Sequence, residues 1–434
     1  MIPTPTEIRV LANSRTKTSK RDLKRKFPRL RLKAFLDTVP RSTKFRSFMP
    51  KSFTYLNEEL ASMPLSLIKD LYLFINLSEK MDAAYPDYYE KKFAMNAKFF
   101  GGPKVREEIQ ERCTIATMES FPMELDYIIV PKMFPNFPRE RFVALAEKIR
   151  ATIIDTLKEN KWLSKKGRAG AIKKISTASL YLVTPETESQ WNFKPTVAVT
   201  KNTPLRNNTK LAYAERLKDF NELGKRIPTD RWEMSPLKVN AYYQPSFNQF
   251  VLPIAILQSP FFDAENTVEQ NLAAIGSVIG HELGHAIDDM GRRYDYKGRL
   301  RDWVTKRDIT RLHDRTQPLV KQFDSIGHNG TLTLGENIGD LVGISTSFRA
   351  AYPNYTPGKY KADDLQKFYL QFARVWCEVQ TPSFAELRLK TDPHSLGKGR
   401  INEQMKHQLA FREAFSCNES DPMVLKKNEI IKIW

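Results

Sequence analysis

The segment His281-Glu-Leu-Gly-His285 places two imidazoles and a carboxylate within one short stretch of chain. Residues four apart lie one turn apart on the same face of a helix, so both histidines can bind one metal ion at about 2.0–2.1 Å. Glu282 should point off that face, where it can approach a metal-bound water as a general base. The apolar and small residues at 273–280 indicate a buried helix rather than an exposed polar turn. The spacing therefore predicts a hydrolytic zinc site.

A third protein ligand is needed, because a catalytic zinc ion has three of them and one open position. The class with three histidines requires glycine at position 288 and histidine at position 291, whereas this chain has Asp288 and Gly291. Downstream, Glu336 and Asp340 stand one turn apart on one face of a predicted helix. Asp340 can accept the remaining N–H of a ligand histidine and fix its tautomer. We expect one Zn²⁺ ion per chain, bound by His281, His285 and Glu336.

The elements next to this motif are predicted from capping residues and strand formers. A cap from Asn266 to Glu269 starts a helix that continues into the histidine motif. Before it, residues 238–243 and 250–257 are rich in strand formers. Pro253 cannot donate to a sheet ladder, so it predicts an edge position for the second strand.

Upstream, the pattern is mainly helical from residue 53 to about 182. The clearest helix is 139–161, whose apolar stripe is Phe142, Leu145, Ile149, Ile153 and Leu157. Periodicity fades between about 183 and 208, where Pro, Thr, Asn and Glu dominate, and this predicts a domain boundary. The predicted organisation is a basic, flexible lead at 1–50, a helical domain at 51–205 and a catalytic domain at 206–434.

The charge of the chain is unevenly distributed. The formal net charge is +19 over 434 residues, and the first 50 residues contain 14 Lys and Arg against Glu7, Asp22 and Asp37. Three interpretations of this lead stay open: a solvated tail, a transit-like leader, or an arm that contacts an anionic membrane. Nucleic-acid binding is not expected, because stacking aromatic residues and a recognised nucleic-acid fold are missing. No window of about 18 apolar residues predicts a membrane span, and the first ten residues lack the apolar region of a secretory signal.

Together these motifs resemble the neprilysin / endothelin-converting-enzyme family of zinc metallopeptidases, peptidase family M13. The matching segments are Val239–Tyr243, Pro253–Phe262, His281–Gly291, Gly335–Gly343 and Asp392–Arg400. The resemblance runs from about Tyr55 to Trp434. It implies a mainly α, two-lobed protein, in which a zincin-like catalytic lobe with a small β-sheet accompanies an N-terminally shortened helical lobe.

The resemblance also implies the catalytic roles of matching residues. Glu282 would take a proton from the attacking water and pass it to the leaving amine. Asp340 would orient His281. His394, held by Asp392, would donate a hydrogen bond to the oxyanion that forms on the scissile carbonyl.

Other matching residues would bind the substrate. Arg400, steadied by Asp288, would contact a main-chain carbonyl of the peptide. Asn240 and Ala241 would pair with the peptide backbone, which would join a sheet edge as an added strand. The residues that match the family's apolar pocket, which receives the residue after the cut, are Ile256, Phe261, Val278, Val375 and Trp376.

On this resemblance we expect a zinc metalloendopeptidase that cleaves small peptides on the amino side of hydrophobic residues. The alternative is a catalytically impaired relative that binds zinc or peptides without turnover, and the shortened helical lobe is its best support. Family members are type II membrane ectodomains or secreted proteins, although this chain shows neither an anchor nor a signal. The sequence specifies no oligomeric state. Its three cysteines match family positions whose disulfide partners are absent, with Ile431 standing where the last partner is expected.

Overall fold

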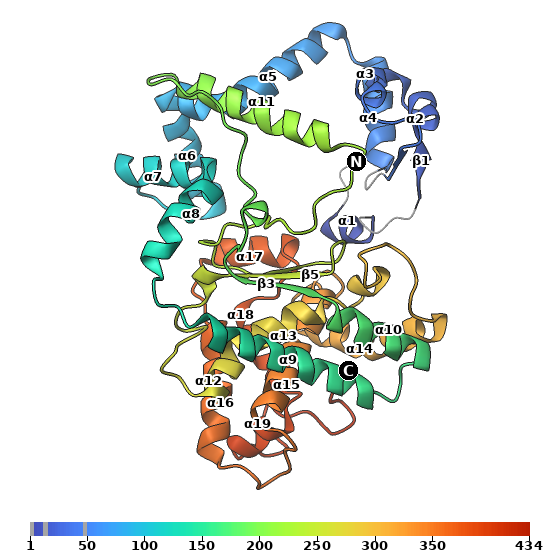
Figure 1. Ribbon diagram of the computed structural model, residues 1–434, viewed down its shortest axis with the longest axis vertical. Helices are drawn as coiled ribbons and strands as arrows, with labels where there is room; N and C mark the ends of the chain where they lie inside the picture. The colour runs from blue at the N-terminus through green and yellow to red at the C-terminus, as the bar shows by residue number, and fades with distance from the viewer. Residues whose placement is uncertain (1–3, 12–15, 47–49) are drawn as a thin grey trace. The chain divides into compact units, whose positions relative to one another are not determined.

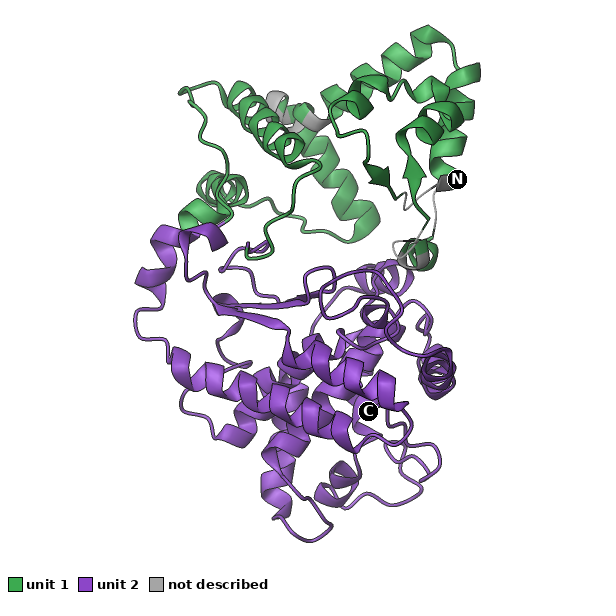
Figure 2. Ribbon diagram, turned by 45° about the vertical axis from the view of Figure 1, so that its right-hand side comes forward, with its two compact units in different colours: residues 1–125, 192–230 green, residues 126–191, 231–434 purple. Residues whose placement is uncertain are grey.

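The computed structural model describes residues 4–11, 16–46 and 50–434, and these form two compact units (Figures 1 and 2). Unit 1 contains residues 1–125 and 192–230, and unit 2 contains residues 126–191 and 231–434. Helices dominate both, so the predicted mainly α class is confirmed. Within the described ranges, none of the helices combines the length and the apolar character that a bilayer crossing requires.

Unit 1 is built from helices and two very short strands. The helices are α1 (Pro5–Leu11), α2 (Lys20–Lys26), η1 (Pro28–Leu30), α3 (Lys33–Asp37), α4 (Pro50–Ser62), α5 (Leu65–Ala84), α6 (Pro86–Phe100), α7 (Ile109–Ser120) and α11 (Pro204–Glu222), and the strands are β1 (Thr18–Ser19) and β2 (Lys44–Phe45). The basic lead was expected to be flexible, but its described residues include three α-helices, and Leu36 is fully buried. The rest of that prediction falls on residues 1–3, 12–15 and 47–49, which lie outside the described residues.

Unit 2 contains every candidate site residue. Its elements are α9 (Arg139–Glu159), α10 (Lys165–Ser176), β3 (Ser179–Val183), η2 (Glu188–Gln190), β4 (Tyr242–Gln244), β5 (Gln249–Pro253), η3 (Ile254–Ile256), α12 (Val268–Asn271), η4 (Leu272–Gly276), α13 (Ser277–Gly284), η5 (Gly291–Arg293), α14 (Lys306–Ser325), α15 (Leu334–Ala351), α16 (Ala362–Val375), α17 (Pro382–Thr391), α18 (Gly397–Met405) and α19 (Leu409–Ala414). Helix α8 (Pro122–Met133) spans the division between the units.

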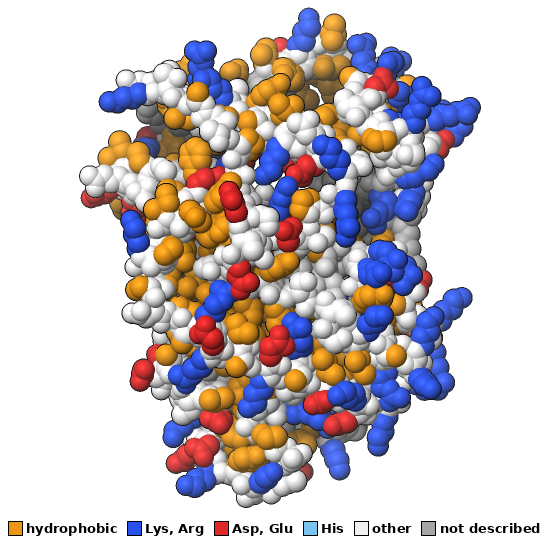
Figure 3. All heavy atoms as spheres, viewed as in Figure 1, with side chains coloured by type: hydrophobic (Ala, Val, Ile, Leu, Met, Phe, Trp, Pro, Cys, Tyr) orange, Lys and Arg blue, Asp and Glu red, His pale blue; other side chains and the backbone are white. Residues whose placement is uncertain are grey.

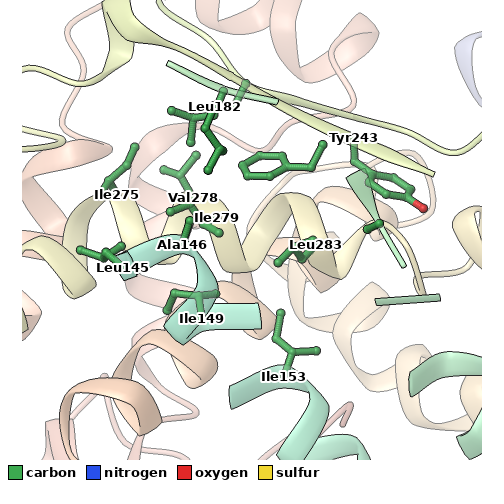
Figure 4. Close-up of a cluster of buried hydrophobic side chains, with 14 of the residues drawn as sticks. Leu145, Ala146, Ile149, Ile153, Leu182, Tyr243, Ile275, Val278, Ile279 and Leu283 are labelled. Atoms are coloured by element: carbon green, nitrogen blue, oxygen red, sulfur yellow. The ribbon is translucent and has the colours of Figure 1, made fainter. Parts of the chain in front are cut away.

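The division differs from a single boundary near residue 205, because residues 126–191 pack with the C-terminal part of the chain. Helix α9 gives the physical reason. Its predicted stripe is buried and joins the same apolar core as α13 and the sheet. In Figure 4, Leu145, Ile149 and Ile153 lie with Val278, Ile279 and Leu283 of α13. This core holds the helix that carries both histidines.

The sheet of unit 2 has the strand order β3-β5-β4. Strand β5 pairs in parallel with β3 (Leu180 opposite Phe250) and antiparallel with β4 (Tyr243 opposite Phe250). The edge position predicted for the second strand is therefore wrong, because β3 covers its other side; Pro253 is tolerated as the last residue of β5. Strand β3 lies at the end of a stretch that was predicted to be helical. Strands β3 and β4 form the two edges of the sheet.

The helix that carries the two histidines starts one residue later than predicted. Thr267 is the N-cap, and it exchanges hydrogen bonds of 3.2 Å with Gln270, so the reciprocal cap does not involve Asn266 and Glu269. The chain then runs through α12 and a five-residue π-helical turn, η4, into α13. Such π turns occur frequently near functional sites.

Helices α13 and α15 cross at very close range. A Cβ on Gly280 would lie 2.9 Å from the Cα atom of Gly343, and a Cβ on Gly343 would lie 2.4 Å from the carbonyl oxygen of Ser277. Only glycine allows the two backbones to approach this closely. The crossing brings residues near position 281 of one helix to residues near position 339 of the other.

Candidate metal centre

Three predicted ligands converge at the crossing of α13 and α15. Nε2 of His281 lies 2.9 Å from Nε2 of His285 and 3.2 Å from Oε2 of Glu336. Nε2 of His285 lies 3.4 Å from the same oxygen. His281 is buried, and the other two side chains are largely covered. Among the described residues, these three side chains form the group of His, Cys, Asp or Glu whose ligand atoms could hold one ion.

The contacts of the two Nδ1 atoms determine which tautomer each histidine adopts. Nδ1 of His281 lies 2.8 Å from Oδ1 of Asp340, and Nδ1 of His285 lies 2.9 Å from Oδ2 of Asp288. An ionised carboxylate only accepts hydrogen bonds, so both Nδ1 atoms carry the proton. In the neutral rings the two Nε2 lone pairs then point at each other and at a carboxylate oxygen. Lone pairs that face one another repel unless a cation lies between them.

A zinc ion fits this arrangement. With bonds of about 2.0–2.1 Å, a tetrahedral ion requires ligand atoms about 3.3 Å apart, and the three separations here are 2.9, 3.2 and 3.4 Å. Oε2 of Glu336 is buried and makes no hydrogen bond of acceptable geometry within the described part of the chain. Burial opposes a charge on His285, but Glu336 and Asp288 outweigh it and raise the pKa of this histidine well above its usual value. The pocket thus attracts positive charge.

Asp340 joins the ligand His281 to a buried arginine. Its carboxylate accepts two hydrogen bonds from Arg400, from Nε at 2.9 Å and from Nη2 at 2.7 Å, besides the contact to His281. Burial alone would raise the pKa of Asp340, but Arg400 and His281 lower it to about 2. The guanidinium of Arg400 also lies 3.6 Å from the centre of the Trp376 ring. Arg400 is therefore held by Asp340 and Trp376.

Asp288 has a different partner from the one expected. It was expected to steady Arg400, whereas its carboxylate lies against His285 and also accepts the backbone N–H groups of Met290 at 2.8 Å and Gly291 at 2.6 Å. The reason is local: helical turns continue past the end of α13, with hydrogen bonds from Ala286 to Leu283 and from Ile287 to Gly284, so Asp288 lies on the same side of the chain as His285, three residues before it. Each candidate histidine ligand therefore has its own carboxylate partner.

His394 lies on the opposite side of Glu336. Its Nε2 is 3.1 Å from Oε2 of Glu336, and its Nδ1 is 3.0 Å from Oδ1 of Asp392. Burial disfavours the charged ring, yet the neighbouring carboxylates of Asp392 and Glu336 raise the pKa of His394 to about 9. Asp392 is itself held by Arg388 at 2.9 Å. Nε2 of His394 therefore faces the candidate metal centre, while Nδ1 is held by Asp392.

The candidate substrate residues occupy two places. Asn240 and Ala241 directly precede the edge strand β4, and the N–H of Ala241 donates to Oδ1 of Asn240 at 2.9 Å. Four residues of the predicted apolar pocket belong to or pack against one apolar core: Ile256, Phe261, Val278 and Trp376. The fifth, Val375, is the last residue of α16 and directly precedes Trp376.

The sequence alone did not indicate the groups that hold the His394 segment against the helix of Glu336. Oγ of Ser395 donates to Oδ1 of Asn337 at 2.8 Å, and Nε2 of Gln404 donates to the carbonyl of Asn337 at 3.1 Å. All three side chains are fully buried. The positions of Asn337 and Ser395 directly after Glu336 and His394 were a signal for these two residues, whereas nothing in the sequence singles out Gln404. Residue types of this kind are common at surfaces too.

Comparison with known proteins gives a consistent result. Two family models, both described as Peptidase family M13, match residues 240–431 and 2–185. The endothelin-converting enzyme homolog of Locusta migratoria is 33% identical over 342 residues, which cover 74% of this chain and 46% of that protein. Neprilysin-3 of Drosophila melanogaster is 31% identical over 352 residues, covering 76% and 44%. The chain thus spans less than half the length of these relatives.

Solved structures show the same fold. The zinc metalloprotease Zmp1 of Mycobacterium tuberculosis, solved with an inhibitor, matches with a TM-score of 0.89 and 25% identity, over 100% of this chain and 68% of that one. PepO of Lactobacillus rhamnosis matches with a TM-score of 0.87 and 24% identity, over 100% and 69%. The predicted zincin-like fold is confirmed.

Proposed function

Because the chain belongs to peptidase family M13, we propose that it is a zinc metalloendopeptidase that cleaves small peptides on the amino side of hydrophobic residues. The observation that carries the proposal is the convergence of His281, His285 and Glu336 at distances suited to a tetrahedral ion. Glu282 follows the first ligand on the same helix and is 8% exposed. A ligand set with an adjacent carboxylate is what metal-assisted hydrolysis requires.

Zinc bound at this centre would supply a Lewis acid for the scissile carbonyl and would make water a better nucleophile. The protein side chains do the remaining work. Glu282 accepts a proton from the attacking water and delivers it to the leaving amine. His281 and His285 are kept in one tautomer by Asp340 and Asp288, so their Nε2 lone pairs stay directed at the ion.

His394 is suited to stabilise the oxyanion. A donor contributes most where charge develops during the reaction, and a protonated imidazole donates a charge-assisted hydrogen bond. Asp392 holds His394 through Nδ1 and leaves Nε2 facing the metal centre. Arg400, fixed by Asp340, presents a second cation for a substrate carbonyl.

Substrate binding is proposed to use the edge of the sheet and the adjoining apolar core. An extended peptide adds to an exposed edge through main-chain hydrogen bonds, and Asn240 and Ala241 lead into the edge strand β4. The apolar side chains that would receive a hydrophobic residue after the cut are Ile256, Phe261, Val278, Val375 and Trp376.

The test is the substitution Glu282→Gln, which keeps the shape of the side chain and removes the base. With an internally quenched peptide that carries one hydrophobic residue, we expect the parent chain to cut before that residue. The variant should retain one zinc per chain and lose about 10²–10⁴-fold in rate. Zinc binding by the parent without any peptide cleavage would contradict the proposal and support the catalytically impaired alternative, which no feature of the site favours.

A further inference from the structure

Lys174 of α10 is buried completely, although nothing in the reaction uses it. Its Nζ atom donates to the carbonyl oxygens of Gly291 and Tyr294, both at 2.7 Å, and lies 5.7 Å from the centre of the Tyr243 ring. Burial lowers its pKa to about 7, although Asp288 and Asp295 act in the opposite direction. A buried amine is costly unless its donors are paired, so its position needs a structural reason.

The two carbonyls belong to the segment between α13 and α14, which has little regular structure. Gly291 begins η5 within this segment. Its N–H donates to Oδ1 of Asp288 at 2.6 Å, and the other carboxylate oxygen of Asp288 lies 2.9 Å from Nδ1 of His285. Three successive hydrogen bonds therefore join Lys174, Gly291, Asp288 and His285.

Gly291 is also packed directly on the metal-binding helix. A Cβ on this residue would lie 1.7 Å from the carbonyl oxygen of His285. The backbone of Gly291 thus rests against the end of α13, and no larger residue can occupy its place. Any movement of Gly291 must shift either Asp288 or the end of the helix that carries His285.

We propose that Lys174 is a positioning residue for the metal centre. By fixing Gly291 and Tyr294 it keeps Asp288 beneath His285 and keeps the Nε2 lone pair of His285 directed at the ion. Partners of this kind typically change metal affinity by about 10–100-fold when they are lost. The proposal rests on the metal centre described above but not on peptide cleavage, because zinc affinity can be measured without a substrate.

The experiment compares Lys174→Met with two matched variants of the same helix. Lys173→Met removes an adjacent, exposed lysine that lies over the Tyr296 ring but belongs to none of the hydrogen bonds that lead to His285, and Ile175→Val trims a fully buried side chain of the apolar core. Zinc dissociation constants are measured by competition with a chelator, and the Co²⁺-substituted proteins are compared by their visible spectra. We expect Lys174→Met to bind zinc about 10–100-fold more weakly and to change the Co²⁺ spectrum, whereas both controls keep the parent values.

Two further variants separate positioning from general destabilisation. Lys174→Gln retains two N–H donors and should recover part of the affinity, which also covers the case in which Lys174→Met does not fold. If Lys174 acts through Asp288, the loss in Lys174→Met/Asp288→Ala should be smaller than the product of the two single losses. Parent zinc affinity and an unchanged Co²⁺ spectrum in folded Lys174→Met would overturn the proposal, as would independent effects in the double variant. If Lys174→Met does not fold, independent effects of Lys174→Gln and Asp288→Ala on zinc affinity would overturn it.

Discussion

Replacing Gly343 by alanine would place a methyl group where α13 and α15 cross. The added Cβ would lie 2.4 Å from the carbonyl oxygen of Ser277 and 3.2 Å from the backbone nitrogen of His281. Carbon atoms in ordinary contact need about 3.5 Å, so the helices must separate by about 1 Å. Both neighbouring groups are backbone atoms, which cannot rotate away as a side chain does.

The consequence for the metal centre follows from where the ligands stand. His281 is on α13, His285 is the C-cap of the same helix and Glu336 is on α15, so a separation of the helices would pull the candidate ligands apart. Zinc distances tolerate deviations of about 0.2 Å, so a shift of about 1 Å removes one ligand from bonding distance. We expect Gly343→Ala to weaken zinc binding by about tenfold or more and to cost about 1–3 kcal/mol of unfolding free energy from overpacking.

The assay is a zinc titration in the presence of a competing chelator, combined with urea unfolding of the metal-free chain. Gly276→Ala is the matched control, because it lies on the same helical run and its Cβ would meet only side chains, of Leu272 and Ile149, at 3.3 Å or more. Parent-like zinc affinity in Gly343→Ala, with an unfolding free energy equal to that of the control, would refute the argument from close helix packing.

Two other predictions concern buried polar groups. Asp340→Asn should weaken zinc binding about 10–100-fold because His281 loses its carboxylate partner. It should also lower the unfolding free energy by about 3–5 kcal/mol, because the buried charge of Arg400 is left without an opposite charge. A zinc affinity equal to that of the parent in a chelator competition would contradict this prediction. His407 accepts the N–H of Ile431 at 3.1 Å, and burial lowers its pKa to about 4. As the pH falls, the imidazole of His407 is protonated in the unfolded chain before it is protonated in the folded one, so the unfolding free energy should fall by roughly 3 kcal/mol between about pH 6.5 and pH 4. In urea unfolding, the free energy of His407→Gln should depend less on pH than that of the parent. Parallel pH dependences of the two proteins would rule the effect out.

The parts of the site that were predictable are those encoded within one helical turn. The spacing of His281 and His285, and that of Glu336 and Asp340, fixes which side chains share a helix face. The stripe of α9 was found for the same reason, since helical periodicity is local. Local patterns therefore indicated both the metal chemistry and the helix that supports it.

The parts that were not predictable depend on contacts between distant residues. The partner of Asp288 was misassigned, because only the turn after α13 decides whether it faces His285 or Arg400. Strand β3 is recognised only by its pairing with β5, which lies 70 residues later in the chain, with Ser179 opposite Gln249. Lys174 stands among exposed lysines, and its burial is set by a loop more than a hundred residues downstream.

Charge illustrates the same limit. Counting residues located the excess positive charge in the first 50 residues. On the face shown in Figure 3, Lys and Arg side chains also gather over the region of α10 and α14. The exposed basic residues at the starts of these two helices are Lys165 and Lys166 in α10 and Lys306 and Arg307 in α14. The basic character of the chain is therefore not confined to its lead.

The most direct test of the metal centre is X-ray absorption spectroscopy of the purified chain loaded with one equivalent of zinc. We expect nitrogen and oxygen neighbours only, at about 2.0–2.2 Å, with the outer-shell scattering of two imidazoles. Glu336→Ala should lower the affinity and leave the two-imidazole signature in place. A sulfur neighbour at about 2.3 Å, supplied by the free thiol of Cys113, Cys377 or Cys417, or the absence of imidazole scattering, would contradict the assignment of His281, His285 and Glu336 as the zinc ligands.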